Sequence, residues 1–316
     1  NKSKSYVWVD TNENGRFDAG ERYEPNQAVK TIVTNEEGYA QTPEKYLPYG
    51  SYMIKETKAP EGYLLDEIRG AKTSLNFTIS EEGQVITKYW SASNTEDTMY
   101  DAAPRGKVKI QKNNADVHSD DKASTASGNA SFKGAEYTIY NKSKSYVWVD
   151  TNHNGTYEAN EKFQPNAAIS VLTIGDDGKA ETPDKYLPYG TYEIRETKAP
   201  EGYLINDNFR NSVTSKTIQI RSEGQAADLT WSKSNAENTF YDAIKRGQIK
   251  IKKNNADVHS DSEAVKAQGD SSLKGAEYTI YNKSKSYVWV DTNENGRFDS
   301  GERYEPNQAV KTIVTN

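Results

Sequence analysis

Short segments in which apolar and polar residues alternate dominate the chain. The clearest are residues 106–112, 134–140, 145–150, 190–197 and 216–220. This period of two is typical of a half-buried strand, and turn sequences such as NHNG, GDDG and LPYG separate the segments. No stretch sustains the period of a capped amphipathic helix. The pattern predicts an all-β protein built from β-sandwiches.

Long sequence blocks recur almost unchanged along the chain. NKSKSYVWVDTN begins at Asn1, Asn141 and Asn282, and KNNADVHSD begins at Lys112 and Lys253. Such spacing predicts a tandem array of sandwich repeats. The short linkers DAAPRG and DAIKRG favour a stiff, elongated rod. The predicted domains are the C-terminal part of one repeat, a complete repeat and the N-terminal part of a third: residues 1–105, 106–246 and 247–316.

Composition narrows the classes of function. Only 34% of the residues are hydrophobic, so each core should be thin, and the absence of cysteine excludes disulfides and metal-thiolate sites. The net charge is −6 with no basic stripe, which argues against a nucleic-acid partner. No apolar run is long enough to span a membrane. Residues 113–133 are rich in Ser, Ala, Asn and Asp, and we expect an exposed loop there.

A twelve-residue segment with the ligand order of an EF-hand loop follows the YVWV strand in every copy. In such loops oxygen ligands at alternate positions wrap one face of Ca²⁺, and a glycine at position six permits the sharp turn. The simpler alternative is a solvated turn, but three matching copies favour calcium. The predicted ligands, at positions one, three, five, seven, nine and twelve, are Asp10, Asn12, Asn14, Arg16, Asp18 and Glu21; Asp150, Asn152, Asn154, Thr156, Glu158 and Glu161; and Asp291, Asn293, Asn295, Arg297, Asp299 and Glu302.

Three ionisable residues lie on predicted strands where inward-facing side chains belong. Lys112 shares a face with Val108 and Ile110, Glu196 ends the strand GTYEIRET, and Asp242 lies in the last strand of the repeat. Buried ions are costly. Burial lowers the pKa of a lysine and raises that of a carboxyl. The amine of Lys112 can then attack Asp242, with Glu196 relaying protons, to form an amide and release water. A non-covalent buried network, or side chains turned outward, remains the alternative.

The motif ETKAPEGYL, preceded by LPYGxYxI, resembles the Cna protein B-type domain, also called the SpaA-type or prealbumin-like repeat. GKVKIQK and YDAIKRG are similar to its first and last strands. The resemblance implies a stalk or pilus-shaft domain of a Gram-positive surface protein. It also implies a Lys112–Asp242 isopeptide bond assisted by Glu196. The insert carrying the calcium-type loop departs from this family and resembles the calcium segment of staphylococcal serine-aspartate repeat adhesins.

The incomplete repeats carry parts of the same trio. The first has Glu56 and Asp101 without a lysine, and the third has Lys253 without carboxyl partners. Neither can close its own crosslink. Either the chain is a segment of a longer array, or the two ends of different chains complement one another by strand addition.

These observations favour a structural stalk repeat on the bacterial cell surface, outside the cell, with neighbouring repeats as its partners. The alternative is an adhesive repeat that binds a host-surface, matrix or glycan ligand, which an exposed patch of Tyr23, Tyr39 and Tyr46 would favour. An enzyme has little support, because all three histidines fall in polar loops. The only chemistry we expect is autocatalytic crosslinking.

Overall fold

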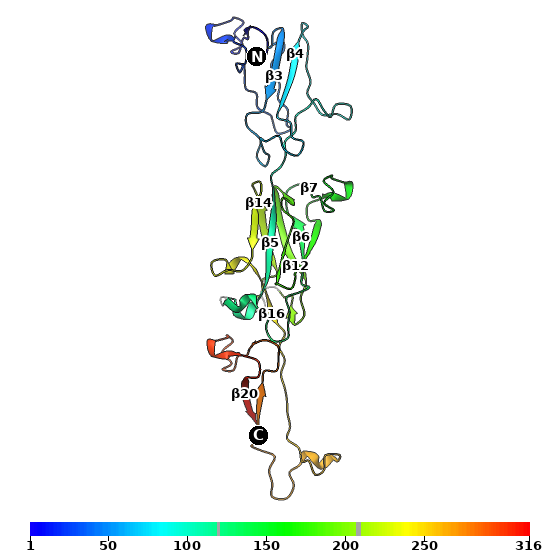
Figure 1. The fold of residues 1–316 in the computed structure, drawn as a ribbon, viewed down its shortest axis with the longest axis vertical. Helices are drawn as coiled ribbons and strands as arrows, with labels where there is room; N and C mark the ends of the chain where they lie inside the picture. The colour runs from blue at the N-terminus through cyan, green and yellow to red at the C-terminus, as the bar shows by residue number, and fades with distance from the viewer. Residues whose placement is uncertain (119–120, 207–209) are drawn as a thin grey trace. The chain divides into compact units, whose positions relative to one another are not determined.

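A computed structural model describes residues 1–118, 121–206 and 210–316 (Figure 1). The chain divides into two compact units, Asn1–Pro104 and Arg105–Asn316. The described residues form β-strands and short 3-10 helices with no α-helix among them, which confirms the all-β class. Across these ranges no helix has the length and apolar character needed to cross a membrane.

The first sheet of the complete repeat is built around β5, the first strand (Figure 1). The last strand, β16, lies beside β5 and runs parallel to it, with Phe240 opposite Lys112 and Asp242 opposite Asn114. The first and last strands of the repeat are therefore direct neighbours. The strands of this sheet are β5 (Arg105–Asn114), β10 (Lys179–Glu181), β11 (Leu187–Pro188), β13 (Tyr203–Leu204), β15 (Ala226–Leu229) and β16 (Phe240–Ile244).

The second sheet is antiparallel and has the order β14-β12-β6-β9. Its strands are β6 (Glu136–Asn141), β9 (Ala168–Thr173), β12 (Gly190–Lys198) and β14 (Ser215–Ile220). Alternate residues of both sheets are buried in one core, with Val108 and Ile110 from β5 and Ile139 and Ile194 from the second sheet. This arrangement is the predicted sandwich, because a period of two buries one face of each sheet.

The insert forms a small hairpin whose strands are shorter than the alternation of residues 145–150 predicts. In the complete repeat it consists of β7 (Val147–Trp148), η4 (Ala159–Glu161) and β8 (Lys162–Phe163). The other two copies are β1 (Val7–Trp8), η1 (Ala19–Glu21) and β2 (Arg22–Tyr23), and β18 (Val288–Trp289), η7 (Ser300–Glu302) and β19 (Arg303–Tyr304).

The prediction of an exposed loop at residues 113–133 is wrong for much of the described part; residues 119–120 lie outside it. Strand β5 continues to Asn114, whose side chain caps η2 (Ala115–Val117) by accepting a hydrogen bond from the amide of Asp116. A second short helix, η3 (Asp121–Ser124), follows. Ala115, Val117 and Ala123 are buried in a second apolar cluster, so small residues pack here rather than face water.

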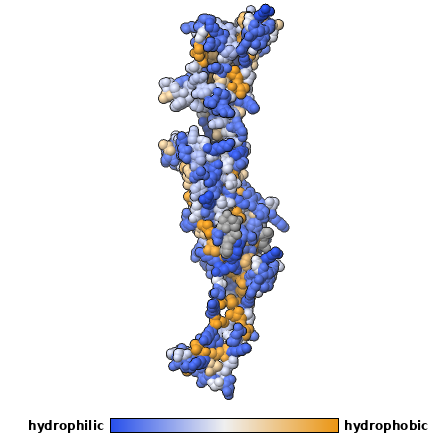
Figure 2. Space-filling view, turned by 180° about the vertical axis from the view of Figure 1, so that it is seen from behind, coloured by the Kyte–Doolittle hydropathy of each residue, from blue (hydrophilic) through white to orange (hydrophobic). Residues whose placement is uncertain are grey.

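The incomplete repeats contain only parts of this sandwich. The first unit has β3 (Gly50–Lys55) paired with β4 (Ser74–Ile79), and its small core contains Val9 and Tyr52. After the complete repeat come η6 (Ser262–Val265), β17 (Glu277–Tyr281) and β20 (Ala309–Val314); a further short helix, η5 (Ala236–Asn238), precedes β16. Figure 2 shows hydrophilic residues over most of one face, with hydrophobic residues in separate groups.

Candidate crosslink site

Lys112, Glu196 and Asp242 come together inside the complete repeat. The Nζ atom of Lys112 lies 2.7 Å from Oε2 of Glu196 and 2.6 Å from Oδ1 of Asp242. All three side chains have an exposed fraction of 0%. The amine of one strand of the first sheet thus touches carboxyl groups from the other sheet and from the closing strand.

Strand geometry explains this convergence. Val108, Ile110 and Lys112 alternate inward along β5, so the lysine extends the buried stripe. The register of β16 places Asp242 opposite Asn114, diagonally across from Lys112. Glu196 lies at the end of the regular β12–β6 pairing, just before a register shift. Such irregularities re-aim a side chain at the edge of a sheet.

The site is electrostatically unbalanced. Burial raises the pKa of Glu196 to about 8; the positive charge of Lys112 opposes this, and the nearby charge of Asp242 adds to it. Within the described ranges, Glu196 Oε1 and Asp242 Oδ2 accept no hydrogen bond, whereas Asp242 Oδ1 is in ion-pair contact with the Lys112 amine. A buried carboxylate without hydrogen bonds costs considerable free energy. The folded repeat therefore disfavours the ionised form of Glu196.

Two aromatic side chains, Tyr137 and Phe240, also line the site, and neither was predicted from the sequence. The Tyr137 ring centroid lies 5.6 Å from the Nζ atom of Lys112 and 4.6 Å from the ring of Phe240. Burial raises the pKa of Tyr137, and the charges of Glu196 and Asp242 raise it further. The available signal was the GAEYTIY alternation, which places Tyr137 on the same face as Ile139. These rings shield the three groups from water.

The incomplete copies do not assemble this site. Glu56 lies beside Asp101, and its pKa is raised to about 7, first by burial and then by the hydrogen bond and charge of Asp101. Lys253 is exposed and belongs to no strand. The six residues predicted for crosslinking thus fall into three groups: the buried trio of the complete repeat, the carboxyl pair Glu56 and Asp101, and the exposed Lys253.

The three calcium-type loops adopt the same conformation. The carboxylate at position one accepts hydrogen bonds from the amides at positions five and six, as Asp10 does from Asn14 and Gly15. Asp150 and Asp291 repeat these bonds. The glycine at position six has φ values of 77 to 81° in the three loops, which favours glycine. The turn that a bound ion would require is therefore already formed.

The loops fit a calcium ion in part. The side-chain amides of Asn12 and Asn14 both donate to Asp18, so positions three, five and nine converge. The terminal Glu21 instead accepts hydrogen bonds from the amides of Thr11, Asn12 and Asp18. These bonds, that from Asp18 foremost, lower the pKa of Glu21. Among the described residues no three His, Cys, Asp or Glu side chains are grouped as metal ligands would be.

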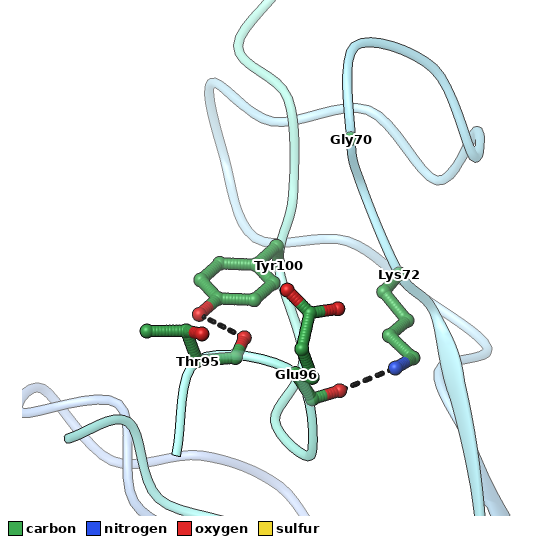
Figure 3. A pocket seen from close by; sticks show the side chains of 5 residues that line it. All are labelled: Gly70, Lys72, Thr95, Glu96 and Tyr100. Carbon is green, nitrogen blue, oxygen red and sulfur yellow. Dashed lines mark hydrogen bonds between the residues drawn. The ribbon is translucent and has the colours of Figure 1, made fainter. Parts of the chain in front are cut away.

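One pocket of the described residues lies away from these sites. A shallow pocket in the first unit is lined by Gly70, Lys72, Thr95, Glu96 and Tyr100 (Figure 3). Lys72 and Tyr100 already donate to the main-chain carbonyls of Glu96 and Thr95 (Figure 3).

The tyrosine patch considered as an adhesive surface does not form. Tyr46 is buried, and Tyr23 packs against the small core of the first unit. Tyr39 is 55% exposed and makes an edge contact with Tyr89. The three tyrosines therefore do not share one exposed face, because two of them fill the core under the insert.

Comparison with curated proteins finds relatives along nearly the whole chain. Serine-aspartate repeat-containing protein D of Staphylococcus aureus (strain Newman) is 26% identical over 325 residues, covering 96% of this chain and 19% of the relative. The protein of strain USA300 is 26% identical, covering 96% and 18%. The chain thus spans about a fifth of the length of these relatives.

Comparison with solved structures also finds matches to bacterial proteins. The Bacillus anthracis TIE protein is 21% identical with a TM-score of 0.43, covering 90% of this chain and 37% of that chain. The shaft pilin spaA from Lactobacillus rhamnosus GG is 14% identical with a TM-score of 0.28, covering 71% and 70%. Likeness at these scores carries no argument about function.

The sequence family gives a firmer result. The prealbumin-like fold domain, SpaA, matches residues 9–94 and 106–233, which together exceed half of the chain. The match includes β5, β12 and the insert, and the two-sheet sandwich of the complete repeat agrees with it. The chain belongs to the SpaA family of prealbumin-like fold domains.

Proposed function

We propose that this chain is a structural stalk segment of a Gram-positive cell-surface protein, and that its complete repeat is closed by an amide bond between Lys112 and Asp242. Membership of the SpaA family and similarity to serine-aspartate repeat proteins support the surface role. The observation that carries the covalent part is the fully buried contact of 2.6 Å between the amine and the Asp242 carboxylate.

The chemistry balances without any outside reagent. The Lys112 ammonium gives up a proton to the Asp242 carboxylate, and the neutral amine attacks the Cγ atom of Asp242. Protonated Glu196, whose pKa is raised to about 8 by burial, exchanges protons with the nitrogen and the departing oxygen. A C–N bond forms, a C–O bond breaks and one water leaves. Two buried charges become a neutral amide, which removes their desolvation cost.

The test is the intact mass of the denatured chain. We expect a deficit of one water molecule for the whole chain, since only one repeat carries the full trio. Glu196→Ala should restore the full mass. Glu56→Ala, at the matched position without a lysine, should leave the deficit unchanged. Peptide mapping should join the segments that contain Lys112 and Asp242. A full mass for the unmutated chain contradicts the covalent proposal while leaving the stalk role open.

The stalk proposal includes one Ca²⁺ per insert. Oxygens of Asp150, Asn152, Asn154, Glu158 and Glu161 would hold it in the complete repeat, with equivalent residues in the other two copies. The ion would supply a fixed charge that braces the insert. The preformed turns at positions one to six support this proposal. Carboxylates mixed with neutral amides suit the modest affinity of extracellular modules.

Calcium binding is tested by titration calorimetry on the whole chain. We expect three ions, falling to two in Asp150→Asn, which keeps one oxygen and so can accept one of the two turn hydrogen bonds. A chelator should lower the melting temperature and speed protease cutting in the inserts. Magnesium serves as the control cation. No heat and no change of melting temperature would show that the loops are self-sufficient turns.

A further inference from the structure

Three copies of the SYVWVD sequence have unequal environments. The tyrosine is 46% exposed at both Tyr6 and Tyr146, but only 4% exposed at Tyr287. Trp289, two residues later, is buried as well. Because the local sequence is identical, the difference arises from what lies against the third copy.

Tyr287 is held by the segment that follows β5 in the complete repeat. Its hydroxyl, which has a single proton to donate, lies 3.0 Å from the main-chain carbonyls of both Lys122 and Thr125. Its own carbonyl accepts a hydrogen bond of 2.7 Å from the amide of Gly128 and one of 3.2 Å from the Ser127 hydroxyl. These contacts fix one tyrosine on a segment more than 150 residues earlier in the chain.

The contact also buries apolar surface. Tyr287 and Trp289 pack in one cluster whose other members come from η2, η3 and β16: Ala115, Val117, Ala123, Tyr241 and Ala243. Gly128 has φ +64°, and a Cβ atom there would lie 3.3 Å from Val288. This close approach explains the glycine. We name residues 115–118 and 121–130 the docking segment, and the tyrosine and tryptophan of the insert the docking face.

An arginine at the end of a repeat donates a hydrogen bond to the main-chain carbonyl of the tryptophan in the next insert. Arg246 donates to the carbonyl of Trp289 at 2.9 Å and contacts Asp116 of the docking segment at 2.6 Å. Arg105 donates to the carbonyl of Trp148 at the same distance of 2.9 Å. This arginine contact therefore occurs at the two inserts that carry Trp148 and Trp289, whereas the buried tyrosine occurs at the second of them.

We propose that the docking face of every insert binds the docking segment of the repeat before it, so that the joint at Tyr287 is the repeating joint of the array. Residues 1–105 contain no copy of the docking segment, which accounts for the exposed Tyr146. The third repeat carries one, with Asp257, Ala264 and Gly269 at the positions of Asp116, Ala123 and Gly128.

The proposal does not rest on the covalent bond. Tyr241 and Ala243 belong to the docking cluster, while Phe240 belongs to the sandwich core and Asp242 to the crosslink site. Alternate residues of a strand face opposite sides. The joint and the crosslink site therefore occupy opposite faces of β16.

The test compares two tyrosines that have the same sequence neighbours. In hydrogen exchange of the full chain, Tyr287→Ala should speed exchange of the Gly128 amide and of residues 122–127 by about tenfold or more, as local opening becomes easier. Tyr146→Ala should leave these amides unchanged. Tyr287→Phe, which removes only the hydroxyl, should give a smaller increase. Equal exchange in all variants would overturn the proposal.

A second experiment places a docking segment in the repeat before a copy of Tyr146. In oxidative footprinting of the unmutated chain, Tyr6 and Tyr146 should react faster than Tyr287. A lengthened chain that carries residues 106–246 twice in tandem gives the downstream copy of Tyr146 a docking segment. That tyrosine should then become as protected as Tyr287. If it reacts as fast as Tyr6, the joint is not a repeating one.

Discussion

Lys112 and Lys253 begin the same nine-residue sequence but have opposite environments. Lys112 is fully buried between two carboxylates, whereas Lys253 is exposed. The difference lies in the partners: β12 and β16 bring Glu196 and Asp242 to Lys112, and residues 247–316 contain no copy of these strands. The buried trio is thus a property of the closed sandwich and not of the lysine motif.

The largest effect should come from removing the two lysines in turn. A crosslink closing the chain from Lys112 to Asp242 should stabilise the repeat by about 5 kcal/mol in the chain-entropy account. Lys112→Ala should lose this amount in chemical unfolding, whereas Lys253→Ala should lose nothing measurable. In single-molecule pulling, the unmutated repeat should not extend between residues 112 and 242.

The Lys112→Ala repeat should instead extend by nearly its full contour length, because force then reaches the thin core. If the unmutated repeat also unravels completely, no covalent bond carries the load, and the contrast between the two lysines is one of burial alone.

The next largest effect on unfolding free energy should distinguish the core of the complete repeat from the core of the first unit. Ile194 in β12 is fully buried between two sheets, and its counterpart Ile54 in β3 is only half-buried. We expect Ile194→Ala to cost about 3 kcal/mol of unfolding free energy and Ile54→Ala about 1 kcal/mol. Hydrogen exchange of β12 and β3 amides measures each locally. Similar costs would mean that the first unit packs as well as the complete repeat.

The smallest effect concerns pH. The pKa of Glu56 is raised to about 7 by burial and by Asp101, so the folded first unit favours the protonated carboxyl. Its stabilising contribution is complete below the ordinary carboxyl pKa of 4.5 and is lost as the pH rises through about 7. We expect the first unit to lose less than about 1 kcal/mol between pH 5 and pH 8, since water screens this site.

Urea unfolding followed at β3 and β4 measures this loss. Glu56→Gln should abolish the pH dependence. A stability that rises over the same range would reverse the assigned direction of the shift.

Much of the fold could be predicted from sequence because alternation encodes it directly. The segments at residues 106–112, 134–140, 190–197 and 216–220 became β5, β6, β12 and β14. Each of these strands buries one face, so its period of two is unambiguous. The inward direction of Lys112 followed from Val108 and Ile110 by the same rule.

The remaining features depend on contacts that no local pattern records. The docking segment has a polar composition, yet a few small residues bury it against β16 and the next insert. Tyr146 and Tyr287 have the same neighbours in sequence and differ in exposure. Tyr137 was not predicted as part of the site, because its place beside Lys112 depends on how the two sheets face each other.

The parallel pairing of β5 with β16 has a consequence for biogenesis. A chain that emerges with its N-terminus first presents β5 early, but Asp242 arrives about 130 residues later. The proposed Lys112–Asp242 bond cannot form before the last strand of the repeat has emerged. The proposed joint can form only after the following insert has emerged. With the proposed bond and joint, the repeats would therefore close one after another, in the order in which they emerge.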